Sequence, residues 1–172
     1  MKDKNESIYF KINSAVRRHG HLPGIIRVSS RVTAAAVYIF FPFMLLYLTD
    51  FGRKFGFDIV NTIVVTASGF LLVTLIRKLI DRKRPYEVFG YDPVIPRSRS
   101  VGSMPSRHVF SAFIIAFASY QMGAPWFAVL FALSVIIAVI RVAGGVHYIS
   151  DILAAFLIAA ALGVPAFMIN LQ

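Results

Sequence analysis

The chain of 172 residues is 58% hydrophobic and has a mean hydropathy of +0.71. Because a soluble domain is typically about 45–50% apolar even when glycine is counted, this composition excludes an ordinary water-soluble globule. Eighteen Lys and Arg residues give a formal net charge of +10, and the absence of cysteine excludes disulfides, thiol catalysis and cysteine-bound metals.

Residues 1–30 are basic and contain no apolar run long enough to cross a membrane. Within them, apolar residues recur close to one helical face: Ile8, Tyr9, Ile12 and Val16. This spacing predicts an amphipathic helix lying on an anionic membrane surface, with a disordered basic tail as the alternative. Residues 19–24 are interpreted as a linker. A cleaved signal peptide is not expected, because some thirty residues precede the first long apolar run.

Four uncharged runs, at residues 32–49, 59–76, 109–140 and 152–172, predict membrane-spanning helices. About 20 apolar residues cross a bilayer core, and about 18 suffice for a candidate span. The third run is too long for one crossing, and Gly123-Ala124-Pro125 offers a turn near its middle. We therefore predict an all-α, polytopic transmembrane bundle of about five spanning helices, residues 31–172, preceded by the interfacial segment 1–30.

The distribution of charge predicts which side of the membrane each loop occupies. Five crossings place the amino terminus and residues 77–108 and 141–147 on one face, and residues 50–58 and the C-terminus on the other. The first face then carries sixteen basic residues, and the second carries two, Arg53 and Lys54. The positive-inside rule therefore predicts a multi-pass cell-membrane protein whose basic face is cytoplasmic.

Charged and polar residues gather in three segments, 77–85, 102–108 and 141–151. Each segment lies at the same end of a predicted helix, so the three are expected to converge at one membrane boundary. Charged residues at membrane depth are costly and are usually functional. The convergence therefore predicts a functional site on the basic face.

His147 and Asp151 form the centre of this predicted site. Being four residues apart, they share a helix face and can hydrogen-bond. A carboxylate bound to one ring nitrogen sets the tautomer and leaves the other nitrogen free to attack, so the pair is typical of a nucleophile with its orienting group. His108 can protonate a departing oxygen. A single histidine at a membrane edge is more often structural, so this interpretation depends on the co-occurrence of these groups with arginines.

The arginines and one helix start predict phosphate binding. A guanidinium fork binds phosphate oxygens bidentately and keeps its charge, which suits Arg84 and Arg141. Pro85 is expected to end the second spanning helix. Pro105 is expected in the first turn of the third, where backbone N–H groups and the Ser106 hydroxyl can face an anion. The other basic residues near these helix ends are interpreted as snorkelling anchors: Arg82, Lys83, Arg97 and Arg99.

At these residues the chain resembles the type 2 phosphatidic acid phosphatase (PAP2) superfamily of membrane lipid phosphatases, whose fold is shared with vanadium haloperoxidases. The superfamily pattern is Lys-x6-Arg-Pro, then Pro-Ser-Gly-His, then Ser-Arg-x5-His-x3-Asp. The third motif is matched, with Ile140 in place of serine, at Arg141, His147 and Asp151.

The other two motifs are matched with one departure each. The second motif is matched, with Arg107 in place of glycine, at Pro105, Ser106 and His108. The first is matched at Arg84-Pro85, where Arg77 takes the lysine position and Lys78 lies one place out of register. The resemblance runs from about residue 58 to residue 172.

The resemblance implies a PAP2-like helical core and a reaction through a phosphohistidine. It makes His147 the nucleophile, Asp151 its orienting group and His108 the acid for the leaving group. The phosphate oxygens would be held by Arg84, Arg141, Ser106 and either Arg77 or Lys78. Arg107 would bind a second phosphate or serve as an anchor. No metal or other cofactor is implied, and the superfamily usually has six crossings where five are predicted here.

The leading hypothesis is an integral-membrane lipid phosphatase that hydrolyses a phosphate monoester or diphosphate of a phospholipid or polyprenyl lipid. A haloperoxidase or a phosphatase for soluble substrates is less favoured, because the chain has no extra domain to enclose a polar substrate. The alternative from another class is a non-catalytic binder or transporter of anionic lipids. The predicted partners are the bilayer and the lipid substrate, with no nucleic acid. The sequence leaves the headgroup and the oligomeric state open.

Overall fold

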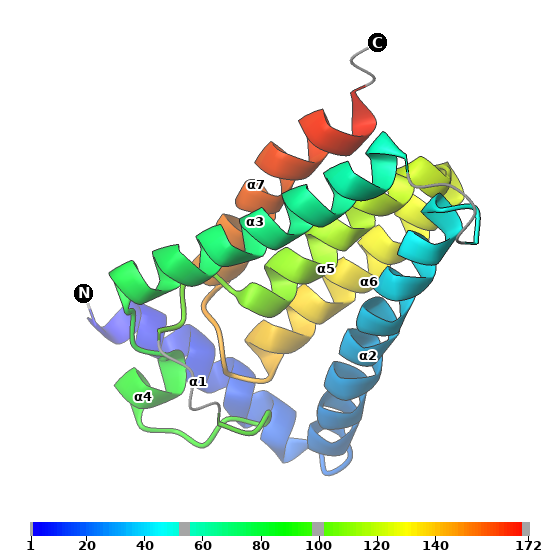
Figure 1. The fold of residues 1–172 in the computed structure, drawn as a ribbon. Helices are drawn as coiled ribbons and strands as arrows, with labels where there is room; N and C mark the ends of the chain where they lie inside the picture. The colour runs from blue at the N-terminus through cyan, green and yellow to red at the C-terminus, as the bar shows by residue number, and fades with distance from the viewer. Residues whose placement is uncertain (1, 52–55, 98–101, 170–172) are drawn as a thin grey trace.

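The computed structural model describes residues 2–51, 56–97 and 102–169. Over these ranges the backbone forms helices and loops and no β-strand, which confirms the predicted all-α bundle (Figure 1). In chain order the helices are α1 (Lys2–Arg18), α2 (Leu22–Leu48), α3 (Phe57–Ile80), α4 (Pro85–Phe89), α5 (Arg107–Ala118), α6 (Ala124–Ala143) and α7 (Ile149–Gly163). Two short turns extend α5 and α7: the 3₁₀ turn η1 (Ser119–Met122) and the π-helical turn η2 (Val164–Met168).

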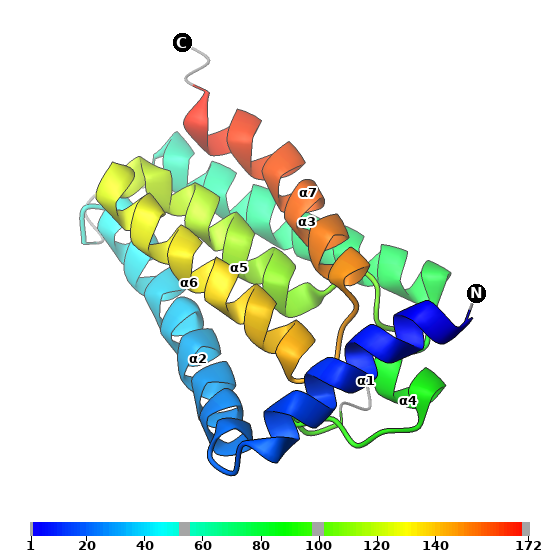
Figure 2. The same ribbon diagram turned by 180° about the vertical axis from the view of Figure 1, so that it is seen from behind.

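Helix α5 runs through the centre of the bundle, with α2, α3, α6 and α7 around it (Figures 1 and 2). Every residue from Val109 to Ala118 is buried. Phe113 of α5 lies edge-on to Phe131 of α6 and Phe156 of α7, with ring centroids 5.2 and 4.9 Å apart. A helix that is covered on all sides can be apolar on every face, which explains why this run lacks a polar stripe.

Four helical segments are long and apolar enough to cross a membrane: Leu22–Leu48, Phe57–Phe89, Ala124–Ala143 and Ile149–Met168. The predicted third crossing differs, because α5 has only 12 residues. At 1.5 Å per residue it is about 18 Å long, well short of a hydrocarbon core of about 30 Å. Its neighbours shield it from lipid, so its length need not match the bilayer. The predicted turn after it is present, and Gly123 there has φ of +116°, which favours glycine.

The amino-terminal segment forms the predicted helix, α1, which crosses one end of the bundle beside α4 and the start of α7 (Figure 2). Its inner face is formed by the buried side chains of Tyr9 and Asn13. The linker after it is shorter than predicted, because α2 already begins at Leu22, with Pro23 in its first turn. Helix α2 then continues without a break through the predicted segment boundary at residues 30 and 31.

The two ends of the bundle carry the loops that the sequence assigns to them. Helices α1 and α4 and the start of α5 lie at one end, and the end of α2, the start of α3 and the turn η2 lie at the other (Figure 1). Arg53, Lys54 and Arg99 lie outside the described residues. The cytoplasmic location of the basic end stays a prediction.

Helix α3 ends earlier than predicted. Its C-cap is Asp81, in a left-handed conformation with φ of +39°, and not the residue before Pro85. Pro85 instead begins the short helix α4, with Arg84 as its N-cap. Proline suits this position because the first residues of a helix need no N–H donor, so the motif forms a turn between two helices.

Candidate active site

The three polar segments converge on one small pocket at the α1/α4 end of the bundle. Its charged and titratable lining comes from the end of α3, the N-cap of α4, the start of α5, the end of α6 and the loop before α7. These residues are Arg77, Arg84, Arg107, His108, Arg141 and His147. Ile95, Pro96 and Val146 complete the wall. The predicted convergence is therefore observed, and it concentrates positive charge around two imidazoles.

His147 is held from behind by Asp151. The His147 Nδ1 atom lies 3.2 Å from Asp151 Oδ2, which also accepts a hydrogen bond from the backbone N–H of Tyr148 at 3.0 Å. Both side chains of the pair are almost completely buried. A carboxylate can only accept, so Nδ1 carries the proton and Nε2 keeps its lone pair.

The reason for this pairing differs from the expected one. His147 precedes Tyr148, the N-cap of α7, and so does not lie on a helix face with Asp151. Asp151 lies in the first turn of α7, where a carboxylate is favoured by the helix dipole, and it reaches back to the residues before the helix. The pair is formed by helix capping.

Burial lowers the pKa of His147 to about 4. The main cause is desolvation, which disfavours the charged imidazolium, and the nearby charges of Arg84 and Arg77 act in the same direction. Asp151 opposes these effects through its hydrogen bond and its negative charge. The imidazole is therefore neutral at pH 7, which is the form that a nucleophile requires.

The start of α5 contributes Arg107 and His108 to the pocket lining, and Ser106 lies next to them, outside that lining. Ser106 is the N-cap of α5, its backbone N–H donates to the Asp151 carbonyl at 3.1 Å, and its carbonyl accepts from Phe110 N at 2.9 Å. The Ser106 Oγ and Arg141 Nε atoms are buried, and within the described residues neither has a hydrogen-bond partner. Buried polar atoms are normally paired, so these two atoms indicate room for a polar ligand. Pro105 precedes the N-cap instead of lying in the first turn, as the sequence had predicted.

Of the two candidates for the lysine position, Arg77 faces the pocket and Lys78 does not. Arg77 is buried and donates to the carbonyls of Gly102, Ser103 and Pro105, at 2.5 Å, 3.4 Å and 3.0 Å, respectively. Lys78 is exposed and is absent from the pocket lining, which corrects its assignment as a phosphate ligand. One step along a helix rotates a side chain by about 100°, enough to separate the two.

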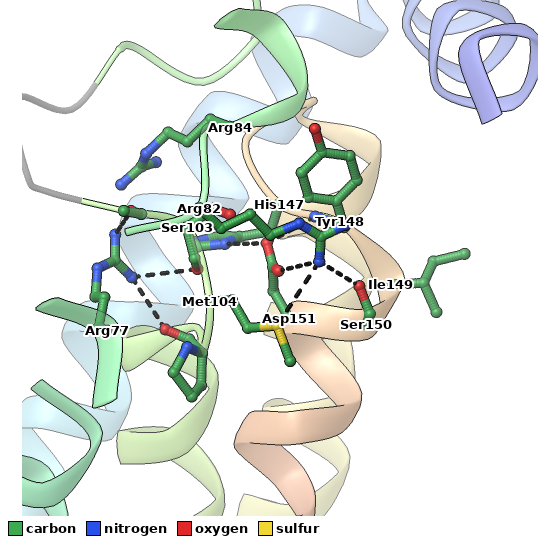
Figure 3. Close-up of polar contacts among 12 residues, drawn as sticks. Arg77, Arg82, Arg84, Ser103, Met104, His147, Tyr148, Ile149, Ser150 and Asp151 are labelled. Atoms are coloured by element: carbon green, nitrogen blue, oxygen red, sulfur yellow. Dashed lines mark hydrogen bonds and ion pairs between the residues drawn. The ribbon is translucent and has the colours of Figure 1, made fainter. Parts of the chain in front are cut away.

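Arg82, interpreted above as a membrane anchor, instead contacts the buried pair. Its Nη1 atom lies 3.1 Å from Asp151 Oδ1 and 2.7 Å from Ser150 Oγ (Figure 3). Its guanidinium carbon lies 3.8 Å from the centroid of the Tyr148 ring. The snorkelling interpretation of Arg82 is therefore wrong. Lys83 is exposed, and Arg97 forms an exposed ion pair with Asp92, so neither joins this group.

The loop that carries His147 is also supported by α1, a contact that the sequence did not indicate. The Tyr9 hydroxyl accepts a hydrogen bond from the backbone N–H of Ile149 at 3.1 Å, and its ring lies edge-on to Tyr148 at 5.2 Å. At the other end of the loop, the Gly144 carbonyl accepts hydrogen bonds from Val94 N and Ile95 N at 3.0 and 3.3 Å. These contacts fix the backbone around His147 from two sides.

Comparison with known proteins assigns the chain to a family. A model of the PAP2 superfamily matches residues 58–171, which contain every polar segment of the pocket. The chain belongs to the PAP2 superfamily. The comparison with curated proteins gives no match.

Two solved structures share the PAP2 fold of this chain. The crystal structure of Aquifex aeolicus LpxE superposes with a TM-score of 0.72 at 23% identity, covering 95% of this chain and 94% of that one. The first transmembrane PAP2 type phosphatidylglycerolphosphate phosphatase from Bacillus subtilis gives 0.67 at 21% identity, covering 95% of this chain and 85% of that one. Together with the four long apolar helical segments, the likeness identifies this PAP2 protein as a multi-pass membrane protein.

Proposed function

We propose that this PAP2 protein is a membrane phosphatase that hydrolyses the phosphate ester or diphosphate of a membrane lipid. The observation that carries the proposal is the single pocket in which His147 and His108 lie among four arginines. Phosphoryl transfer requires positioning and charge stabilisation more than any other contribution, and this lining supplies both.

In the proposed reaction, the His147 Nε2 lone pair attacks phosphorus while the bond from phosphorus to the lipid oxygen breaks. Burial, followed by the charge of Arg141, lowers the pKa of His108 to about 3. The negative charge of a bound phosphate opposes this shift, so His108 would hold the proton that it donates to that oxygen, and the lipid leaves as an alcohol, or as a phosphate from a diphosphate. His108 then takes a proton from a water that attacks the phosphohistidine. The N–P bond breaks, its electrons return to Nε2, and phosphate is released.

The remaining groups of the pocket are assigned to charge stabilisation. Arg84, Arg141, the Ser106 hydroxyl and the N-terminus of α5 would bind the phosphate oxygens. Arg77 would stabilise the phosphate charge beside them, and it would also order the loop at residues 102–105. Arg107 is assigned to a second phosphate, and the presence of its side chain in the same pocket lining supports this assignment. No metal takes part in this scheme, and we assign no cofactor.

The membrane surroundings favour a lipid as the substrate. The pocket is lined by residues at one end of helices that are long and apolar enough to cross a membrane, which is where lipid headgroups would be expected. One structural neighbour is described as a phosphatidylglycerolphosphate phosphatase. A phospholipid or polyprenyl phosphate therefore fits better than a soluble ester.

The test is a substrate panel assayed with purified protein in the presence of a metal chelator. Phosphatidic acid, a phosphatidylglycerol phosphate, a polyprenyl diphosphate and a short-chain water-soluble ester would be compared by release of inorganic phosphate. We expect release from at least one long-chain lipid and much slower release from the soluble ester. Binding of these lipids with no hydrolysis by the intact protein would instead identify a lipid binder or transporter.

The same panel in vesicles of known protein orientation tests the side of the membrane. We propose that the pocket faces the cytoplasm, because the sequence pattern assigns sixteen of the eighteen basic residues to the face that carries the three polar segments. Substrate supplied only to that face should then be consumed. Consumption restricted to the opposite face would contradict the proposed orientation without affecting the proposed chemistry.

The acid limb of the pH profile should lie well below the usual range for histidine. Only neutral His147 can attack, so activity is present above its pKa of about 4 and is lost as the pH falls through that value. We expect kcat/KM to decline only below about pH 5, and not near the ordinary histidine value of about 6.5. The limb should stay in place for two substrates whose phosphate pKa values differ. A limb near the ordinary value for both would contradict a buried neutral nucleophile.

A further inference from the structure

Asp151 is fully buried, and both of its carboxylate oxygens are bound. Oδ2 accepts from His147 Nδ1 and from the Tyr148 N–H, and Oδ1 faces Arg82 Nη1 at 3.1 Å. A buried carboxylate requires a compensating charge, because removal from water is costly. His147 is neutral in this site, so it does not supply that charge. The ion pair with Arg82 supplies positive charge directly at the carboxylate.

Arg82 is itself fixed on several sides. Its Nη1 atom donates to Ser150 Oγ at 2.7 Å, and its guanidinium stacks on the Tyr148 ring at 3.8 Å. Its backbone carbonyl accepts from Ser103 N at 2.8 Å, which ties it to the loop before α5. One residue thus connects all three polar segments. Since its side chain is 35% exposed, this ion pair is partly screened by solvent.

Arg82 differs in position from the arginines of the pocket. It is absent from the pocket lining, whereas Arg84, two residues later, belongs to it. Figure 3 shows the two guanidinium groups on different sides, with that of Arg82 directed at Asp151 and Ser150. Arg82 therefore contacts the partner of His147 and not the space that a phosphate would occupy.

We propose that Arg82 is a positioning residue for phosphoryl transfer, acting through Asp151 to hold the His147 ring with Nε2 towards the pocket. The inference rests on the proposed function of His147. Without Arg82, the buried carboxylate loses its compensating charge. Removing this cation favours a proton on His147, so the attacking form is lost at a higher pH than in the intact protein.

The test uses the full-length protein with Arg82→Gln and Arg82→Lys, and with Lys83→Gln as the matched control for an exposed neighbouring cation. Initial rates on the best lipid of the panel would be measured from about pH 4 to about pH 8. For Arg82→Gln we expect kcat to fall about 10- to 100-fold, as for other groups that orient a reacting side chain. KM should stay within about threefold, because no phosphate contact is lost.

The pH profile separates positioning from general destabilisation. The acid limb of Arg82→Gln should move up by about one pH unit, and Arg82→Lys should restore the limb because it returns the charge. Lys83→Gln should match the intact protein in rate and in pH profile. If Arg82→Gln does not fold, Arg82→Lys tests the proposal instead. Lysine keeps the positive charge but stacks less well on the Tyr148 ring, so kcat should fall while the acid limb of the pH profile stays in place.

Two outcomes would overturn the inference. One is an unchanged kcat and an unchanged limb in Arg82→Gln; the other is a change confined to KM, which would place Arg82 in substrate binding. A His147 variant tested in parallel keeps the two proposals distinguishable. If that variant is inactive while Arg82→Gln behaves as the intact protein, this inference fails and the proposed function stands. If the His147 variant is active, the proposed function fails.

Discussion

Replacing His147 with glutamine is expected to abolish phosphate release. Glutamine is similar in length but has no basic nitrogen, so no phosphoenzyme can form at Nε2. We expect kcat to fall by at least about 10⁴-fold, the scale of losing a catalytic nucleophile. The measurement is phosphate release from the best lipid substrate. In a second measurement the reaction is quenched rapidly without acid, because a phosphohistidine is stable in base and labile in acid. The intact protein should give a phosphorylated chain, and the variant should not.

His19→Gln provides the matched control. His19 is exposed on the short connection between α1 and α2, far along the chain from the pocket residues, and it lies outside the pocket lining. It should retain the activity of the intact protein and the trapped phosphoenzyme. Equal thermal unfolding of the two variants would exclude a folding defect. A His147→Gln protein that turns over at the rate of the intact chain would remove the basis of the proposed mechanism.

Replacing Asp151 with asparagine is expected to lower kcat by about 10³–10⁴-fold, as the loss of an orienting carboxylate does in other nucleophilic enzymes. An amide can present its N–H₂ group to His147 Nδ1, which favours the tautomer with the proton on Nε2. The nitrogen that should attack would then carry a proton. The measurement is kcat and KM on the lipid substrate. KM should change little, because the arginines of the pocket are intact.

The control for this change is Asp92→Asn. Asp92 is an exposed carboxylate in a surface ion pair with Arg97. The substitution therefore makes the same chemical change as Asp151→Asn, at a carboxylate that is not buried. Exposed pairs contribute little, and we expect no change in rate and at most a small change in thermal unfolding. A loss of activity in Asp151→Asn that appears only in KM would assign the carboxylate to substrate binding and contradict its role as the group that orients His147.

Much of the fold was predictable because its signals are local. An apolar run of membrane-spanning length predicts a helix whatever surrounds it, and a glycine before proline predicts a break, which the structure places at Gly123. The length of α5 was not predictable in this way. Its residues have the composition of a spanning helix, and only the four helices packed around it allow a segment of 12 residues to occupy the centre.

Most of the pocket lining was also predictable, because the spacing of Arg141, His147 and Asp151 is specific. The sequence could not separate Arg77 from Lys78, since the difference depends on which side of α3 meets the bundle. The sequence also misplaced Pro85, which was expected to end α3. The helix instead ends at Asp81 in a left-handed conformation. Non-glycine residues rarely adopt this conformation, so the sequence does not signal it.

The sequence by itself determined that this protein spans membranes as a helical bundle and that the histidines and arginines of its three polar segments meet at one end. Both follow from composition and from spacing along the chain. Only the tertiary structure decided how His147, the proposed nucleophile, is held. The contacts of Arg82 with Asp151 and of Tyr9 with Ile149 join residues 69 and 140 positions apart. No pattern within one segment reports such contacts, because they depend on how separate helices pack.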